Sequence, residues 1–281
     1  MIQLTLADMN AWVAGLMWPL TRILGLIAAS PIFGNTSVPA RVKIGLGLIL
    51  AVIMAPTVPS VPAIDPMSFS GLLVVLQEML VGLAMGFAMR IVFAAIELAG
   101  EVSSMTMGLG FAATYDPQTR GRSAALTQFL TLIATLAFLS VNAHLVLLAS
   151  LAESFITLPI GASPVSSGGH FELVKWGGQI FISGLQLSLP IVAALLITNI
   201  ALGILTRAAP QLNLFGIGFP VSLGVGMLVV SIALPYLNMP IQNLLNGGIE
   251  AGRRLTRSSV AAPSQPPTPV PAPLPAAAPQ P

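Results

Sequence analysis

Ionisable side chains are the groups through which an apolar chain would transfer protons, conduct ions or hydrolyse a bond. They lie in or beside its apolar stretches at Glu78, Arg90, Glu97, Glu101, Asp116, His144 and Glu153. These positions are scattered along the sequence, and their spacing does not indicate a pair of acid and base residues of the kind that catalysis requires. The sequence also lacks a GxxxxGK[ST] phosphate loop, an HExxH zinc motif and a GxSxG nucleophile motif. We therefore expect that this protein is not an enzyme.

Cofactor and nucleic-acid binding are likewise not indicated. The chain has no cysteine and two histidines, His144 and His170, which removes thiolate metal sites, iron–sulfur clusters and disulfides. A lone histidine on an apolar helix is typical of a hydrogen-bonded structural residue. The net charge is +2, and no Lys/Arg run coexists with stacking aromatic residues. We expect no cofactor, no metal and no nucleic-acid partner.

Composition indicates an integral membrane protein. Of the 281 residues, 55% are hydrophobic and only 7% are charged, and the mean hydropathy is +0.91. Soluble domains carry roughly 25% charged residues. So little charge cannot cover a water-soluble globule, so membrane lipid is an expected partner of this chain.

Apolar segments broken by proline and glycine predict an all-α fold of about six kinked helices or hairpins, some of which do not span the membrane. They cover about 9–30, 44–61, 69–104, 123–158, 171–205 and 215–237, with a short amphipathic piece at 241–250. As one helix, 123–158 would be roughly 50 Å long, more than the ~30 Å hydrocarbon core. Charge alternation across six spans does not satisfy the positive-inside rule. We therefore expect helices that pack mainly against protein.

Several polar or small residues inside these segments need protein or water neighbours. Arg22 must be buried against a polar partner or lie near an interface, because a charge at that depth is costly. Gly82 and Gly86 form a GxxxG pair that lets another helix approach closely.

Two further helix faces carry polar side chains. The spacing of Arg90, Glu97 and Glu101 places them on one face, which favours either a partner helix or a local Arg90–Glu97 pair. A polar stripe formed by Gln128, Thr135, Asn142 and Glu153 follows on the next segment.

The region 104–122 joins two long apolar segments through a soft, uncharged loop. Its residues include Met105, Met107, Gly108, Leu109, Gly110 and Phe111, and it ends at the turn signal Asp116-Pro117. Such a loop suggests a movable gate or plug; the alternative is an ordinary re-entrant or interfacial connector. Downstream, 161–169 reads as a Gly/Ser/Pro linker, and 258–281 as a disordered Pro/Ala tail.

The order and spacing of several short runs resemble the FliR/MopE/SpaR family of type III secretion export-gate proteins. The resemblance covers roughly residues 10–255. It is carried by RILGLIAASPIF from Arg22, VPARVKIGL from Val38, EMLVGLAMGF from Glu78, ELAGE from Glu97, MGLGFA from Met107, Asp116-Pro117, Asn142-Ala-His144 and Ser154-Phe155.

This resemblance implies a single copy in a ring-like inner-membrane complex with FliP and FliQ, with FlhB at the closed cytoplasmic side. It implies a FliP-like part over 1–160, whose loop at about 104–122 is a plug, and a FliQ-like hairpin with an amphipathic segment over 170–257. The polar positions would then face neighbouring subunits. The candidate residues for this packing are Arg22, Gly82, Gly86, Arg90, Glu97, Glu101, Asn142 and Glu153.

The expected function is therefore a subunit of the flagellar type III protein export gate. It would form part of the channel for unfolded flagellar substrates in the basal body and be required for flagellum assembly. An injectisome gate subunit is an alternative within the family. A small-solute secondary transporter using Arg90, Glu97 or His144 is an alternative of a different class, although no inverted repeat supports it. A membrane scaffold without a pore is a third.

Overall fold

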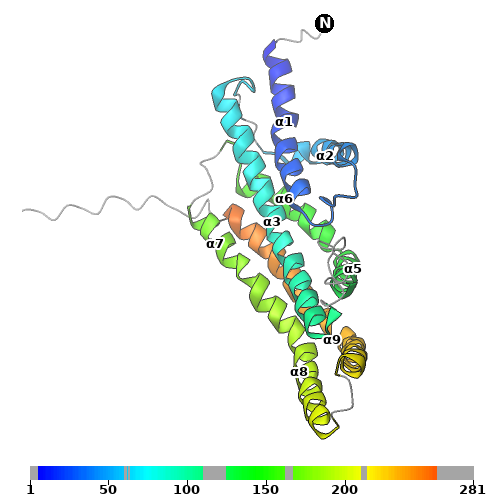
Figure 1. The fold of residues 1–281 in the computed structure, drawn as a ribbon. Coiled ribbons are helices and arrows are strands. Elements are labelled where there is room, and N and C mark those ends of the chain that lie inside the picture. Colours follow the sequence, from blue (N-terminus) through cyan, green and yellow to red (C-terminus); the bar gives the residue numbers. More distant parts are fainter. Residues whose placement is uncertain are drawn as a thin grey trace, which may run out of the picture.

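The computed structural model describes residues 6–59, 62, 64–109, 125–161, 167–209 and 214–257, and every regular element in these ranges is helical. Figure 1 shows an elongated bundle. In chain order the elements are α1 (Leu6–Ala29), α2 (Ala40–Met54), the 3₁₀ turn η1 (Ala55–Thr57), α3 (Phe69–Thr106), α5 (Ala125–Ser140), α6 (Ala143–Thr157), α7 (Ser167–Gly177), α8 (Gln179–Ala208), the π-turn η4 (Leu214–Gly218) and α9 (Phe219–Arg257). The all-α fold predicted from the sequence is confirmed.

Helix α3 is the element against which most others pack. It contacts α1, α5, α7, α8 and α9, and it runs through the centre of the bundle in Figure 1. Ser68 caps its start, where the hydroxyl accepts a 3.0 Å hydrogen bond from the backbone N–H of Gly71. It ends where Gly108 takes a left-handed φ of 84°. The single long helix predicted from residue 69 is therefore confirmed.

Glycines allow α1 and α3 to approach each other backbone to backbone. A Cβ at Gly82 would collide with the carbonyl oxygen of Arg22, and a Cβ at Gly86 would lie 2.6 Å from that of Leu26. From the opposite side, a Cβ at Gly25 would lie 2.6 Å from the carbonyl oxygen of Met79. The close approach predicted for the GxxxG pair occurs, and the helix that fits it is α1 of the same chain.

The proline-free segment 123–158 is two helices, and not the single helix of roughly 50 Å that would exceed the membrane core. Asn142 separates α5 from α6 with φ 55° and ψ 25°, and the two axes are bent by 64°. Asparagine tolerates this left-handed conformation better than other non-glycine residues. Because of this bend, the polar stripe from Gln128 to Glu153 does not continue along one helix face.

The C-terminal helices also differ from expectation. Helix α9 continues through Pro235 and Pro240 to Arg257, so the predicted segment 215–237 and the amphipathic piece at 241–250 form one element. A proline inside a helix removes one hydrogen bond and kinks the axis without ending it when neighbouring elements support both halves. In Figure 1 the gold start of α9 lies nearly end-on, whereas its orange continuation runs beside α3.

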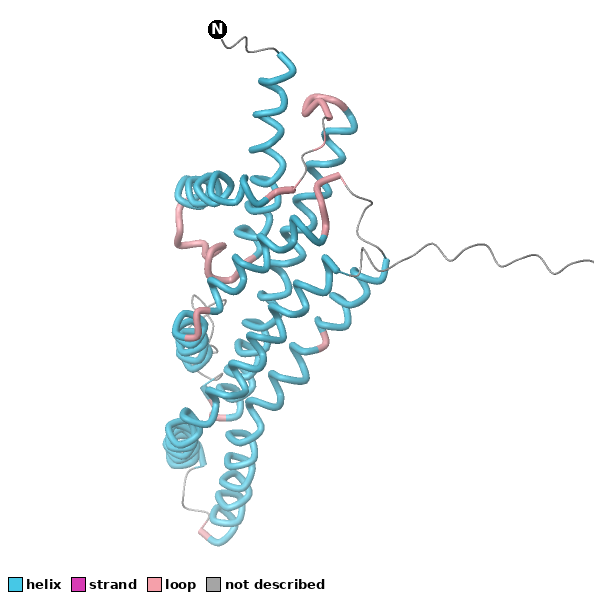
Figure 2. Tube along the Cα trace, turned by 180° about the vertical axis from the view of Figure 1, so that it is seen from behind, coloured by secondary structure: helices cyan, strands magenta, loops and turns pink. Residues whose placement is uncertain are grey.

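Helices α2 and α5 and the start of α9 project to the same side of α3. Figure 1 shows each of them nearly end-on, and Figure 2 shows them from behind. Within the described ranges, four segments are long and apolar enough to cross a membrane, or five if the bent α5–α6 pair is one span. The four are Ala40–Thr57, Phe69–Thr106, Phe171–Ala208 and Gly216–Arg257. The chain is a multi-pass membrane protein.

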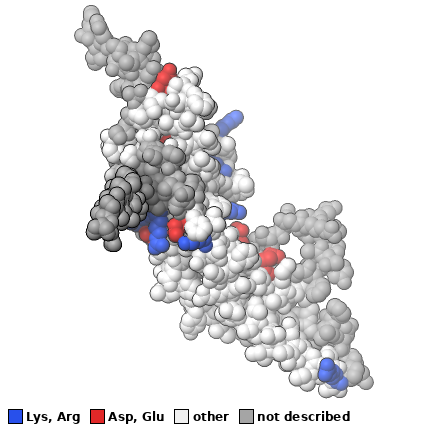
Figure 3. Space-filling view, turned by 90° about the vertical axis from the view of Figure 1, so that its left-hand side faces the viewer, with Lys and Arg blue, Asp and Glu red and all other residues white. Residues whose placement is uncertain are grey.

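The surface is largely apolar. Large hydrophobic side chains on the membrane-length helices are exposed, among them Ile53, Phe181, Ile197 and Met239, each more than 60% exposed. Figure 3 shows charged side chains gathered near the middle of one face, and most of the remaining described surface is uncharged. Such a surface requires lipid or other apolar helices around it.

We predict that Gly82→Ala separates α1 from α3. The added methyl group meets a backbone carbonyl that no side-chain rotation can move, so the variant should lose about 1–3 kcal/mol or more of stability. The apparent melting temperature of the detergent-solubilised protein measures this loss. Gly45→Ala is the matched control, because a Cβ there meets nothing within 4 Å. Equal melting of both variants would contradict the close approach.

Candidate functional site

Arg22 has the largest fully buried polar side chain of the described residues. Both Arg22 and Glu78 are 0% exposed, and Arg22 Nε donates to Glu78 Oε2 over 2.6 Å. Arg22 Nη1 donates to the carbonyl oxygen and hydroxyl of Ser154, at 2.9 and 3.1 Å. Arg22 Nη2 donates to the carbonyl oxygen of Leu158 at 2.9 Å. One side chain therefore joins α1, α3 and the end of α6.

The geometry at Arg22 offsets the unfavourable burial of its charge. Two of its contacts are carbonyls at the C-terminal end of α6, where the helix dipole is negative. The guanidinium carbon also lies 4.5 Å from the centroid of the Phe155 ring, within the range of a cation–π contact. Glu78 Oε1, by contrast, has no hydrogen-bond partner among the described residues. Of the two alternatives predicted for Arg22, the structure shows burial against a polar partner.

The three residues of the polar face predicted on α3 lie in different surroundings. Arg90 is exposed near the middle of the helix, and Glu97 is half-buried. Neither forms an ion pair with another described residue, so the local Arg90–Glu97 pair does not form. Glu101 accepts a 3.2 Å hydrogen bond from the hydroxyl of Thr127 on α5.

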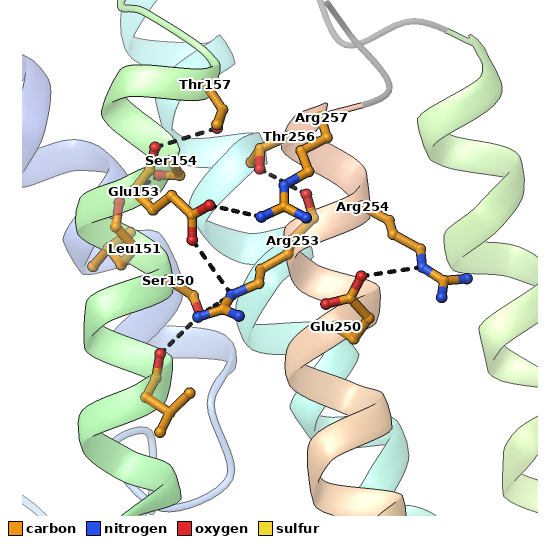
Figure 4. Close-up of polar contacts among 11 residues, drawn as sticks. Ser150, Leu151, Glu153, Ser154, Thr157, Glu250, Arg253, Arg254, Thr256 and Arg257 are labelled. Carbon is orange, nitrogen blue, oxygen red and sulfur yellow. Dashed lines mark hydrogen bonds and ion pairs between the residues drawn. The ribbon is translucent and has the colours of Figure 1, made fainter. Parts of the chain in front are cut away.

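Glu153 anchors the end of α9 to α6, as Figure 4 shows. Its Oε1 accepts a 2.7 Å bond from Arg257 Nη2, and its Oε2 lies 3.5 Å from Arg253 Nε. Arg253 Nε also donates to the hydroxyl of Ser150 over 2.8 Å. On the outer side of α9, Arg254 pairs with Glu250 at 3.4 Å. Sequence reasoning identified Glu153 but not these partners, which are about a hundred residues away along the chain.

The start of the predicted plug loop is partly anchored. Met105 is 65% exposed, whereas Met107 is 0% exposed and Leu109 packs against the core. Gly108 supplies the positive φ that turns the chain out of α3. The other predicted plug residues, Gly110 and Phe111, lie outside the described residues.

The remaining polar candidates, Asn142 and His144, lie at the bend between α5 and α6. Asn142 is exposed at the α5–α6 bend and makes no side-chain cap hydrogen bond. His144 lies two residues later, with its ring centroid 6.2 Å from that of Phe138, and its Nδ1 is buried without a partner among the described residues. No grouping of three or more His, Asp or Glu side chains suited to a metal ion occurs in the described part of the chain. In the described part of the chain, these groups do not converge on one reactive centre.

The fold and these contacts define a class of protein: a multi-pass α-helical membrane protein whose polar groups serve to hold helices together. Residues 13–248 match the family described as bacterial export proteins, family 1. The chain belongs to this family. The match confirms the resemblance noted in the sequence.

Curated relatives show which branch of export the chain resembles. It is 42% identical over 230 residues to the flagellar biosynthetic protein FliR of Pectobacterium carotovorum subsp. carotovorum, a match that covers 82% of this chain and 88% of the relative. It is 41% identical over 237 residues to FliR of Escherichia coli (strain K12), covering 84% and 90%. FliR of Bacillus subtilis (strain 168) is 32% identical over 237 residues, covering 83% and 91%. These relatives support the flagellar assignment over the injectisome alternative.

We predict that Glu78→Ala severely destabilises the protein. The change leaves the Arg22 charge buried without its carboxylate, for which a loss of about 3–5 kcal/mol is expected. The level of protein in isolated membranes and its melting temperature in detergent both measure this effect. Glu172→Ala removes an exposed 3.4 Å pair with Lys175 and should leave both quantities unchanged. If Glu78→Ala melts like the parent, the buried pair does not stabilise the fold.

Proposed function

We propose that this chain is a subunit of the flagellar type III protein export gate in the bacterial inner membrane. Other export-apparatus proteins surround it, and we propose FliP, FliQ and FlhB as these partners. Together they form the channel that unfolded flagellar substrates enter. Family membership and the flagellar names of the curated relatives support this function.

The observation that carries the proposal of an assembly is the position of Arg90. It is exposed near the middle of a 38-residue apolar helix and forms no ion pair with a described residue. An unpaired arginine facing lipid at that depth is disfavoured by at least ~2.5–3.5 kcal/mol on insertion scales. Arg90 therefore requires a polar neighbour, which we assign to a partner subunit or to water in the enclosed channel.

A groove between α7, α8 and α9 supports the same conclusion. It has a volume of about 530 Å³, and its mainly apolar lining includes the polar side chains of Gln179, Ser183, Gln186 and Asn243. Gln186 and Asn243 are exposed, although α8 and α9 are both long and apolar enough to span a membrane. Amides on such helices are satisfied by hydrogen bonds to neighbouring helices. A partner helix carrying polar side chains fits this groove.

The two predicted parts have distinct roles in this proposal. Residues 1–160 supply the FliP-like part, and 170–257 supply the FliQ-like hairpin and the amphipathic end of α9. The two parts pack on each other where α3 contacts α7, α8 and α9. The loop at about 104–122 closes the channel when no substrate passes, because methionine, leucine and phenylalanine side chains exclude water and ions yet reorient easily.

We expect Arg90→Ala to weaken assembly, and Arg90→Glu to abolish it. Both variants remove the positive charge that a partner or channel water must satisfy, and the second reverses it. Co-purification of tagged protein with FliP and FliQ measures assembly, and swimming in soft agar measures export. Arg207→Ala, an exposed arginine in the last turn of α8, is the control and should co-purify normally. Normal co-purification and swimming of both Arg90 variants would reject the inter-subunit role.

The loop proposal predicts a leak. Deleting residues 109–113, or replacing the apolar side chains of 105–113 by serine, removes the seal, so small solutes and ions should cross the membrane several-fold faster. Growth in high sodium or uptake of an otherwise excluded dye measures this passage. Deletion of residues 263–267 in the Pro/Ala tail is the control and should leave the membrane tight. A tight membrane in the loop deletion, with the protein present at normal level, would reject the plug.

A further inference from the structure

The side chain of Met107 lies in a socket on α9 that the absence of a side chain at Gly226 leaves open. A Cβ at Gly226 would lie 2.6 Å from Met107 Cγ, 2.7 Å from Cε and 2.9 Å from Sδ. Met107 is 0% exposed, although Met105, two residues earlier, is 65% exposed. The methionine therefore lies directly on the α9 backbone, immediately after the last turn of α3.

The socket lies on the buried face of α9. Another glycine of this helix, Gly224, does not form such a socket. Ser222 and Val230, one turn before and one turn after Gly226, are also buried, at 7% and 4% exposure. Ser222 Oγ donates to Asn199 Oδ1 of α8 over 3.2 Å, which fixes this part of α9 to the neighbouring helix. A Cβ at Gly224 would meet nothing within 4 Å.

Three properties make this contact suitable for repeated opening. It is apolar and involves one flexible thioether side chain, so its release breaks no hydrogen bond or ion pair. Gly108 follows with φ 84°, a conformation in which the backbone is not helical and can rotate at little steric cost. Finally, the contact joins α3 to α9, which belong to the two different parts of the chain.

We propose that Met107 on Gly226 is a latch: seated, it fixes the start of the 104–122 loop to α9, and it must leave this socket during export. The inference rests on the proposed gate function and adds the device that holds the loop. Met107 is thus assigned as a positioning residue that works through the socket, and not as a residue that itself blocks the channel.

An introduced disulfide tests the latch directly, because the chain has no native cysteine. The Cβ position at 226 lies 2.6 Å from Met107 Cγ, so the two Cβ atoms are at most about 4 Å apart, which does not exceed the ~4.5 Å upper limit for a disulfide. In the full export complex, Met107→Cys with Gly226→Cys should cross-link under mild oxidant and lose labelling by a maleimide-polyethylene glycol. Secretion of flagellar protein should fall at least tenfold and return on reduction.

Controls distinguish the contact between Met107 and Gly226 from its proposed role in export. Met105→Cys with Gly226→Cys should not cross-link, because Met105 faces outward. Failure of the 107–226 pair to cross-link would overturn the proposed contact. If the 107–226 pair cross-links and secretion is undiminished, Met107 does not need to leave the socket during export.

A second variant covers the case in which the double-cysteine protein does not export even when reduced. Gly226→Val removes the socket and should raise solute leakage several-fold while the complex still assembles; Gly224→Val is the matched control and should remain tight. A tight membrane in Gly226→Val overturns the latch. If deletion of 109–113 leaks while Gly226→Val does not, the latch alone fails; if neither leaks, the plug function fails as well.

Discussion

The packing of this protein depends on a guanidinium group removed from water. Arg22 has no exposed surface, and its partners come from α3 and from the end of α6. Any rearrangement that separates α1 from either helix leaves a buried charge without compensation. The pair therefore specifies one arrangement of three helices in surroundings where apolar contacts alone discriminate weakly, because lipid competes for them.

The same interface combines this electrostatic constraint with a steric one. The backbones of α1 and α3 come so close at Gly82 and Gly86 that no side chain fits between them. This closeness brings the base of Arg22 against α3, so that its head group can reach both Glu78 and α6. Close packing and ion pairing thus act together at one interface.

The outside of the subunit contrasts with its inside. Arg22, Glu78 and the Glu153 cluster find their partners within the chain, whereas Arg90 and the groove amides of Gln186 and Asn243 do not among the described residues. Membrane-length helices with exposed polar groups are incomplete surfaces, which suits a component of a multi-subunit export apparatus. The Met107 contact adds an apolar link between α3 and α9.

Much of the architecture follows from the sequence alone. The low charge and long apolar runs require a membrane environment, the apolar run from residue 69 predicts α3, and the GxxxG pair predicts a close helix neighbour, because these effects act over one or a few helical turns. The order of short motifs also indicated the export family. The sequence did not determine which helix packs on Gly82, because a surface of small residues can accept many different helices.

Tertiary structure decided the rest. The break at Asn142 is a single left-handed residue without proline or glycine beside it, and packing on both sides selects it over a continuous helix. Helix α9 passes two prolines because neighbouring helices support both halves. The pairing of Arg22 with Glu78, of Glu153 with Arg257 and of Met107 with Gly226 joins residues tens to more than a hundred positions apart. No local periodicity encodes such contacts, since they exist only once the helices have been brought together.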